Sequence, residues 1–151
     1  MLVICGVIGL LVVSTDSKNA TMDNANTTQQ SGTNDTTLYL SEAPNEIITL
    51  VEYSDFQCPA CAGMFELLNQ AKEEFSDEVS FEFRHFPLTS IHPNAMTARR
   101  IAQAAENQGQ FVFVHDLLFM NTQAWTNASN PTTAIYSLIS ASTSAIDLEM
   151  L

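Results

Sequence analysis

Residues 47–61, IITLVEYSDFQCPAC, decide the fold, because an apolar stretch leads there into two cysteines separated by two residues. The apolar stretch from Ile47 to Tyr53 predicts a buried strand, and the polar residues after it predict a short loop. Pro59 suits the first position of a helix, since its ring fixes φ and its missing N–H would have no partner there. The stretch therefore predicts a strand, a loop and a helix with Cys58 as the N-cap.

This placement favours redox chemistry at the cysteine pair. A thiolate at a helix N-terminus is stabilised by the unpaired N–H groups and the positive end of the helix dipole, which lower the pKa of a cysteine there. Cys61 follows three residues later on the same helical face, within disulfide reach, so we expect Cys58 to attack and Cys61 to resolve. Glu52, if buried beneath the helix start, would have a raised pKa and relay a proton to or from Cys61. Strand alternation equally allows a solvated Glu52.

The alternatives for the pair are a structural disulfide and half of a zinc site. Zinc needs two more ligands at a characteristic spacing, and the three histidines, His85, His92 and His115, do not supply it. A structural bridge that closes so short a loop would add little stability. Redox chemistry is the stronger prediction, with the disulfide between Cys58 and Cys61 as the redox group and with no cofactor or metal.

Composition restricts the partners and the size of the protein. The chain has 151 residues, of which 46% are hydrophobic, enough for one domain with a buried core and a tail. Its 17 acidic and 5 basic residues give a formal net charge of −12. We expect no nucleic-acid partner, because no basic patch is available to release counterions from phosphates.

The N-terminal part predicts export. Leu2–Val13 is an apolar run too short to span a bilayer, and it fits a signal-peptide core or the remnant of an anchor. We therefore expect a signal or anchor segment at 1–13, in which Cys5 is not catalytic, and a disordered polar linker at 14–37. The predicted location is extracytoplasmic, in the periplasm or cell envelope, where an oxidising environment suits a dithiol oxidant.

The rest of the chain predicts an α/β fold in two parts. In 38–90 we expect a β-α-β unit, with strands at 47–53 and 79–85 lying parallel and adjacent, a helix at 59–75 and an optional edge strand at 38–40. In 91–151 the pattern is helical, with helices expected at 93–108, at 110–121 and from Pro131 onward.

An ordered set of motifs over residues 45–140 resembles the DsbA-like thiol:disulfide oxidoreductases of the thioredoxin superfamily. The resemblance implies a thioredoxin-like fold with a helical domain inserted after the second strand. It implies Cys58 as the exposed nucleophile, Cys61 as its buried partner and Glu52 as the acid behind them, with Pro59 and Ala60 tuning the redox potential. The motifs are VEYSDFQCPAC at 51–61, FRHFPL at 83–88, HPNA at 92–95, QGQF at 108–111 and HD at 115–116.

The resemblance also implies a function and partners. Proteins of this family act on exported polypeptides that contain cysteines, and a membrane quinone-linked or reductant-supplying partner recycles them. We therefore expect an exported thiol:disulfide oxidoreductase with the oxidase direction favoured. The alternatives are a reductase or isomerase of the same fold and a non-catalytic, chaperone-like module that binds peptides. For the other recurring polar residues we expect structural hydrogen bonds; they are His85, His92, Asn94, His115 and Asp116.

The last part of the family pattern is not found after the helical region. In the family, a strand preceded by a cis-proline, a further strand and a last helix complete the sheet, but the last proline here, Pro131, lies in a helical pattern. We therefore expect the second half of the thioredoxin sheet to be missing and the chain to be a fragment with reduced stability and impaired substrate binding. The first strand is then expected to present an unpaired apolar edge.

Overall fold

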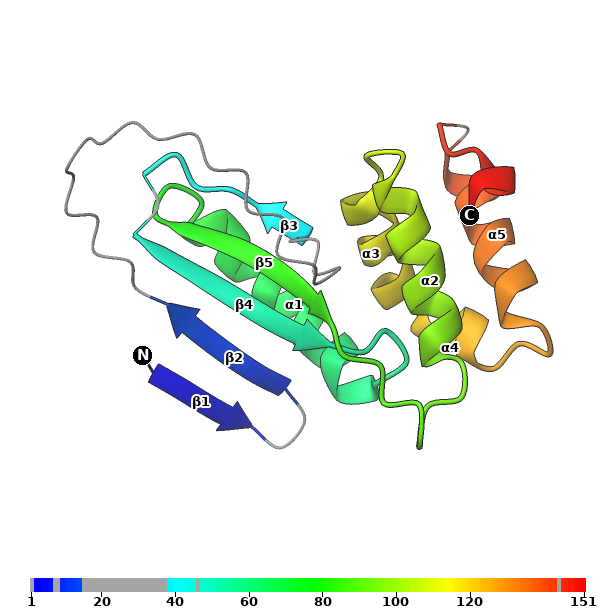
Figure 1. Ribbon diagram of the computed structural model, residues 1–151, viewed down its shortest axis with the longest axis horizontal. Helices are drawn as coiled ribbons and strands as arrows, with labels where there is room; N and C mark the ends of the chain where they lie inside the picture. The colour runs from blue at the N-terminus through cyan, green and yellow to red at the C-terminus, as the bar shows by residue number, and fades with distance from the viewer. Residues whose placement is uncertain (1, 7–8, 15–37, 46, 144) are drawn as a thin grey trace, which may run out of the picture.

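A five-stranded sheet with helices on one face and at one end forms the protein (Figure 1). The computed structural model describes residues 2–6, 9–14, 38–45, 47–143 and 145–151. The strand order is β1-β2-β4-β5-β3. In Figure 1, α1 lies behind the sheet, and α2, α3, α4 and α5 lie together to its right.

The centre of the sheet is the predicted β-α-β unit. The strands β4 (Ile48–Ser54) and β5 (Val79–His85) are parallel, and α1 (Pro59–Glu74) connects them. Ser54 lies opposite His85 at the carboxyl end of this pair. Because the two strands are parallel, their carboxyl ends meet at the same edge of the sheet, where the cysteine pair and the segment after β5 both begin.

The strands outside this unit correct one expectation. The predicted edge strand is β3 (Leu38–Ser41), antiparallel to β5, whereas β2 (Gly9–Ser14) pairs antiparallel with β4 and β1 (Leu2–Gly6) pairs with β2. The prediction of an unpaired edge on β4 is therefore wrong, because the apolar N-terminal run contributes strands to that edge. The signal or anchor role of 1–13 stays a prediction, and the predicted linker lies outside the described residues apart from Ser14.

The helical part follows the predicted order with one addition. The helices are α2 (Ala95–Glu106), α3 (Phe111–Met120), α4 (Thr122–Thr126) and α5 (Pro131–Ser142), followed by a short 3₁₀ turn, η1 (Leu148–Met150). The sequence did not predict α4. Its Trp125 is fully buried and donates from Nε1 to the carbonyl oxygen of Leu118 at 3.0 Å, so tertiary packing fixes this short helix on α3.

An aromatic core joins the sheet to α1 and α3. Phe83 on β5 is fully buried, stacks on Phe56 at a centroid distance of 5.3 Å and meets the His115 ring edge-on at 4.8 Å. Phe65 on α1 and Phe119 on α3 stack on each other at 5.5 Å. The same buried cluster contains Cys58 and Cys61, so the cysteine pair is part of the core that joins α1 and α3 to the sheet.

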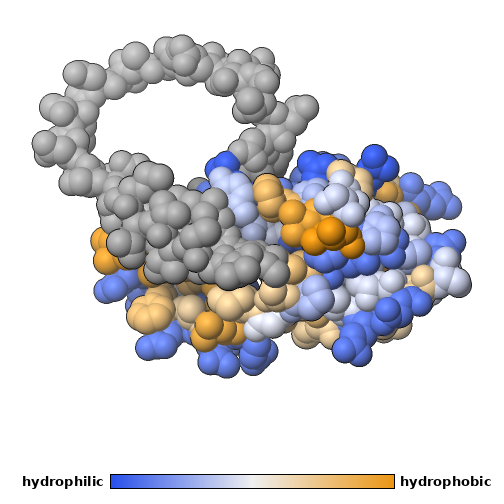
Figure 2. Space-filling view, turned by 90° about the horizontal axis from the view of Figure 1, so that it is seen from below, coloured by the Kyte–Doolittle hydropathy of each residue, from blue (hydrophilic) through white to orange (hydrophobic). Residues whose placement is uncertain are grey.

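The segment 86–94 connects β5 to α2 and lies at the bottom of Figure 1. It exposes two large apolar side chains, Phe86 at 57% and Ile91 at 66%. Figure 2, which is seen from below, shows separate apolar groups among hydrophilic side chains on this end of the molecule. After β5 none of the residues that the structure describes forms a further strand, and no described peptide bond is cis.

Candidate functional site

The helix start places Cys58 as the sequence predicts. Cys58 is the N-cap of α1 with φ −75° and ψ 121°, and Pro59 is the first helical residue. The Cys58 N–H donates to the carbonyl oxygen of Asp55, and the Cys58 carbonyl oxygen accepts from the N–H of Ala62, each at 3.0 Å. The side chain of Cys58 makes no capping hydrogen bond. The backbone thus fixes the loop before α1 with Cys58 at the helix start.

Burial of the pair differs from the expectation. The predicted exposed nucleophile, Cys58, is only 1% exposed, and Cys61 is 7% exposed, whereas Pro59 and Ala60 between them are exposed. Cys58 is buried because it belongs to the same apolar cluster as Phe56. Both cysteines are in the reduced form. The prediction of an exposed Cys58 is wrong for this conformation, and exchange with a substrate requires the loop around Cys58 to open.

Cys61 is held as a neutral thiol. The pKa of its thiol is raised to about 11, chiefly by burial; the neighbouring Cys58 also raises it, whereas the backbone of Asp55 and the side chain of Ser54 lower it. At neutral pH, therefore, Cys61 is protonated when it is reduced. If Cys61 leaves a disulfide as a thiolate, it must receive a proton, so a proton donor is required nearby.

Glu52 has the properties of such a donor. It is 7% exposed on β4, and burial raises the pKa of its carboxyl group, while Ser54 and Lys72 lower it. The solvated alternative for Glu52 is therefore excluded. Ser54 lies close enough to lower the pKa of both Glu52 and Cys61, although its buried Oγ makes no hydrogen bond of normal geometry with described residues. The sequence analysis missed Ser54, which lies two residues after Glu52 and so faces the same side of the sheet.

Asp55 fixes the loop in front of Cys58. Its buried carboxylate accepts from the N–H of Gln57 through Oδ1 at 2.8 Å, and from the N–H of Leu88 and from His92 Nδ1 through Oδ2, each at 2.8 Å. The first bond is an Asx turn, a signal that Asp-x-Gln in the sequence could have supplied. The other two join this loop to a segment more than thirty residues away, which no local pattern reveals.

Gln57 makes a second connection to the same segment. Its Oε1 accepts from the N–H of Asn94, the N-cap of α2, at 2.7 Å. Asn94 Nδ2 donates in turn to the carbonyl oxygen of Thr126 at 3.4 Å. The two residues that flank Phe56 therefore tie 88–94 to the cysteine loop, and the expectation of structural hydrogen bonds holds for His92 and Asn94.

Two further histidines lie in the aromatic core. His115 is 1% exposed and pairs through Nδ1 with Asp116 Oδ1 at 2.8 Å, as expected for a structural hydrogen bond. The buried Nε2 of His85, like that of His115, has no hydrogen-bond partner among the described residues. Burial lowers the pKa of both rings, that of His85 to about 4 with a further contribution from Arg99. Both imidazoles are therefore neutral in the folded protein near pH 7.

This burial predicts acid sensitivity. The pKa of His85 falls from 6.5 in the unfolded chain to about 4 in the folded one, so the unfolded chain binds more protons between these values. The stabilisation is complete above pH 6.5 and is lost as the pH falls to about 4, by up to about 3 kcal/mol. Urea titrations across this range should show a smaller loss for His85→Phe than for the unchanged chain. An equal loss of unfolding free energy in the two proteins would contradict the assignment of this acid sensitivity to His85.

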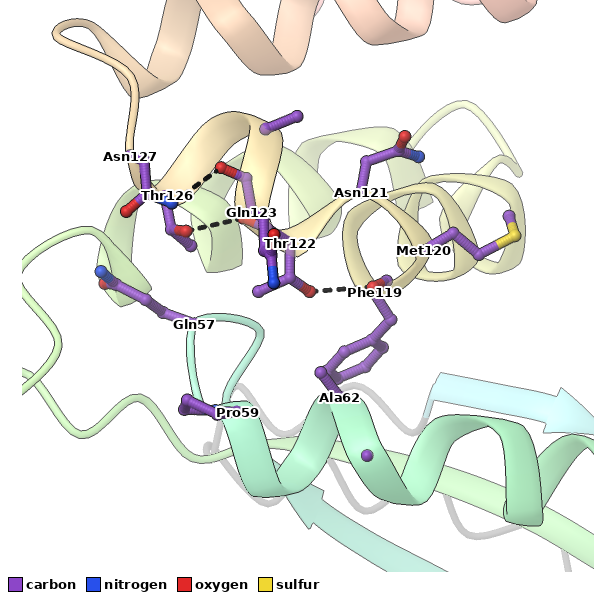
Figure 3. Close-up of a pocket in the computed structure, with 12 residues that line it drawn as sticks. Gln57, Pro59, Ala62, Phe119, Met120, Asn121, Thr122, Gln123, Thr126 and Asn127 are labelled. Carbon is purple, nitrogen blue, oxygen red and sulfur yellow. Dashed lines mark hydrogen bonds between the residues drawn. The ribbon is translucent and has the colours of Figure 1, made fainter.

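A cleft of about 940 Å³ opens beside the cysteine pair (Figure 3). One wall comes from the reactive loop and the first turns of α1, and the other from the end of α3 and from α4. None of the side chains in its lining is charged. The lining residues are Gln57, Pro59, Ala62, Gly63, Phe119, Met120, Asn121, Thr122, Gln123, Ala124, Thr126 and Asn127.

Among the described residues, no three His, Cys, Asp or Glu side chains gather as metal ligands would. None of the helices in the described part of the chain combines the length and apolar character that crossing a bilayer requires.

Together, a parallel β-α-β unit with a CxxC pair at the helix start and a following helical region define a thioredoxin-like domain. A family model described as thioredoxin matches residues 33–149. The chain therefore belongs to this thioredoxin family.

Curated relatives match the chain over a small part of their own length. The chain is similar to the protein named Na(+)/H(+) antiporter NhaA 1 from Mycolicibacterium gilvum, at 41% identity over 45% of this chain and 11% of that protein. The protein of the same name from Salinispora arenicola is 42% identical over 51% of the chain and 11% of its own length. The protein named Na(+)/H(+) antiporter NhaA from Herminiimonas arsenicoxydans is 36% identical over 51% of the chain and 12% of its own length. The chain thus spans about a tenth of these relatives, and no solved structure matches it.

Proposed function

We propose that the protein is a DsbA-like thiol:disulfide oxidoreductase that exchanges a Cys58–Cys61 disulfide with the cysteines of exported polypeptides. The observation that carries the proposal is the pairing of Cys58, at the N-terminus of α1, with a buried Cys61 thiol, together with the buried Glu52 carboxyl group, which shares Ser54 with Cys61 as a neighbour. Family membership supports thiol–disulfide chemistry in general. The oxidase direction, the extracytoplasmic location and recycling by a membrane quinone-linked or reductant-supplying partner are part of this proposal.

In the oxidase direction, a substrate thiolate bonds to Cys58 Sγ and the Cys58–Cys61 bond breaks. Cys61 takes the electron pair and receives a proton from Glu52, which is suited to this role because burial raises the pKa of its carboxyl group. A second substrate thiolate then attacks the substrate sulfur of the mixed disulfide. The substrate disulfide forms, Cys58 leaves as a thiolate, and two electrons have passed from the substrate to the cysteine pair. The reductase or isomerase alternative runs these steps from the dithiol.

Residues other than the cysteines set the conditions for these steps. Ser54 lies close to both Glu52 and Cys61, so we assign it a positioning role in the proton transfer. Pro59 and Ala60 are exposed and separate the two cysteines, where they tune the redox potential. Because Cys58 is buried, the loop that Asp55 fixes must open before a substrate sulfur can reach it.

A redox titration tests the proposal. The full chain carrying Cys5→Ser is equilibrated across a series of reduced-to-oxidised glutathione ratios and alkylated, so that the mass shift counts only the thiols at Cys58 and Cys61. We expect the two thiols to disappear together. A midpoint towards the roughly −120 mV of strong oxidants supports the oxidase direction, and one near the roughly −270 mV of thioredoxin supports the reductase alternative. If the pair stays reduced at every ratio, the proposed chemistry is wrong.

The burial of Cys58 favours one second candidate, a non-catalytic module that binds peptides. Such a module would keep the cleft beside α1 and make no use of the sulfur. The two candidates differ in their response to the loss of Cys58: a binding module would keep its binding, whereas an enzyme would lose exchange.

A further inference from the structure

We propose that the uncharged cleft between α1 and α4 binds the uncharged, extended stretch of the substrate polypeptide that flanks its reacting cysteine. This inference rests on the proposed function, since the cleft supplies recognition to the exchange at Cys58. Three features of the cleft support it: its place beside the cysteine pair, the chemistry of its lining, and a glycine whose place in a helix nothing in the described fold explains.

The place of the cleft couples it to the reaction. Gln57 and Pro59, the residues on either side of Cys58, both line it. A polypeptide segment in the cleft therefore lies within one or two residues of the sulfur that forms the mixed disulfide. Because a substrate held there presents its cysteine repeatedly to Cys58, binding raises the effective concentration of the reacting thiol.

The chemistry of the lining selects the kind of segment. The protein has a formal net charge of −12, yet no charged side chain lines this cleft. Carboxamide and hydroxyl groups form much of the α4 wall, and in Figure 3 the Gln123 side chain points from α4 towards α1. Carboxamides donate to peptide carbonyls and accept from peptide N–H groups. Charged side chains of a substrate would lose water there without gaining an ionic partner, so the lining favours an uncharged segment.

Gly63 provides the independent observation. It lies inside α1, where glycine is less favourable than alanine, yet a Cβ built on it has no atom within 4 Å. No packing within the described fold therefore requires a glycine here. Gly63 lines the cleft, and the missing side chain leaves room for a ligand backbone to approach the helix closely.

Two substitutions of Gly63 separate binding from folding. Gly63→Ala should raise Tm by roughly 2–5 °C, because it removes the helix penalty without a clash. Gly63→Leu fills the space in the cleft. Gln70→Leu is the matched control, since Gln70 is an exposed residue two turns further along α1 that does not line the cleft.

The assay measures the rate at which the oxidised full chain reacts with each of three reductants. These are glutathione, a synthetic dithiol peptide with Ser, Asn and Gln flanks, and the same peptide with Asp flanks. We expect Gly63→Leu to slow oxidation of the uncharged peptide by about tenfold or more, which corresponds to about 1.4 kcal/mol. Gly63→Ala should slow it less, and the rates with glutathione should match those of the unchanged chain and of Gln70→Leu. The preference of the unchanged chain for the uncharged peptide should disappear in Gly63→Leu.

Equal rates of peptide oxidation by Gly63→Leu and Gln70→Leu would overturn the cleft proposal. A preference for the uncharged peptide that persists in Gly63→Leu would also overturn it, because the overall acidic charge of the protein would then explain the preference. A chain that does not react with glutathione at all would instead overturn the proposed function. Glutathione therefore distinguishes the failure of one proposal from the failure of the other.

Discussion

A Cys58→Ser chain is expected to lose all disulfide exchange, whereas Cys61→Ser keeps the first half of the reaction. The reason is the difference between the two thiols. Burial holds the pKa of Cys61 at about 11, so at pH 7 about one Cys61 in ten thousand is a thiolate. Only a thiolate attacks a disulfide, so Cys61 is a poor nucleophile, and we assign the attack to Cys58, the N-cap of α1.

The two variants are compared in a chain that also carries Cys5→Ser, after incubation with oxidised glutathione, with intact mass as the measurement. Cys61→Ser should accumulate a mixed disulfide that adds one glutathione at Cys58, because no second thiol resolves it. Cys58→Ser should remain unmodified. The reverse pattern would assign the attack to Cys61, which is the more exposed of the two at 7% against 1%.

The same variants separate an enzyme from a binding module. A synthetic dithiol peptide in which both cysteines are blocked by methylation reports binding without exchange. A binding module should hold this peptide equally well with or without Cys58 and should show no exchange in the unchanged chain. If the unchanged chain exchanges and Cys58→Ser does not, the enzyme interpretation stands.

The central unit of the fold was predictable because its signals are local. The apolar content of 47–53, the alternation of 79–85 and a proline at position 59 predict two strands and a helix, and the structure confirms them with small shifts at the ends. The parallel pairing follows from the length of the connection, which allows a helical crossover. The short helix α4 has no such signal, because the packing of Trp125 on α3 holds it.

The candidate site was predictable in its chemistry and less so in its accessibility. The CxxC pair follows from residue type and spacing, whereas strand alternation left the burial of Glu52 open and the family resemblance implied its role. The burial of Cys58 does not, because it depends on tertiary packing around the apolar cluster. Bonds such as the one between Asp55 and Leu88, 33 residues apart, likewise have no local signal. The role of Ser54 is predictable only once the burial of the neighbouring Glu52 and Cys61 is known.

Asp55→Ala is expected to destabilise the protein strongly and to expose Cys58. The buried carboxylate accepts from the N–H of Gln57, the N–H of Leu88 and His92 Nδ1, and its removal leaves three donors without their acceptor. Breaking a buried hydrogen-bonded charge pair costs about 3–5 kcal/mol in other proteins. We expect a loss of about 3 kcal/mol or more in the free energy of unfolding, measured by urea titration.

Control variants separate the effect of losing the loop hydrogen bonds from the general effect of removing a negative charge. Glu73→Ala removes one acidic charge from an exposed position on α1 and should change the free energy of unfolding by less than about 0.5 kcal/mol. His92→Ala removes one of the three donors and should have an intermediate effect. Alkylation of Cys58 should be faster in Asp55→Ala than in the unchanged chain under conditions where both are folded, because the bond to Leu88 no longer ties 88–94 to the cysteine loop. An Asp55→Ala chain with unchanged stability and an unchanged alkylation rate would show that this carboxylate controls neither the loop nor access to the sulfur.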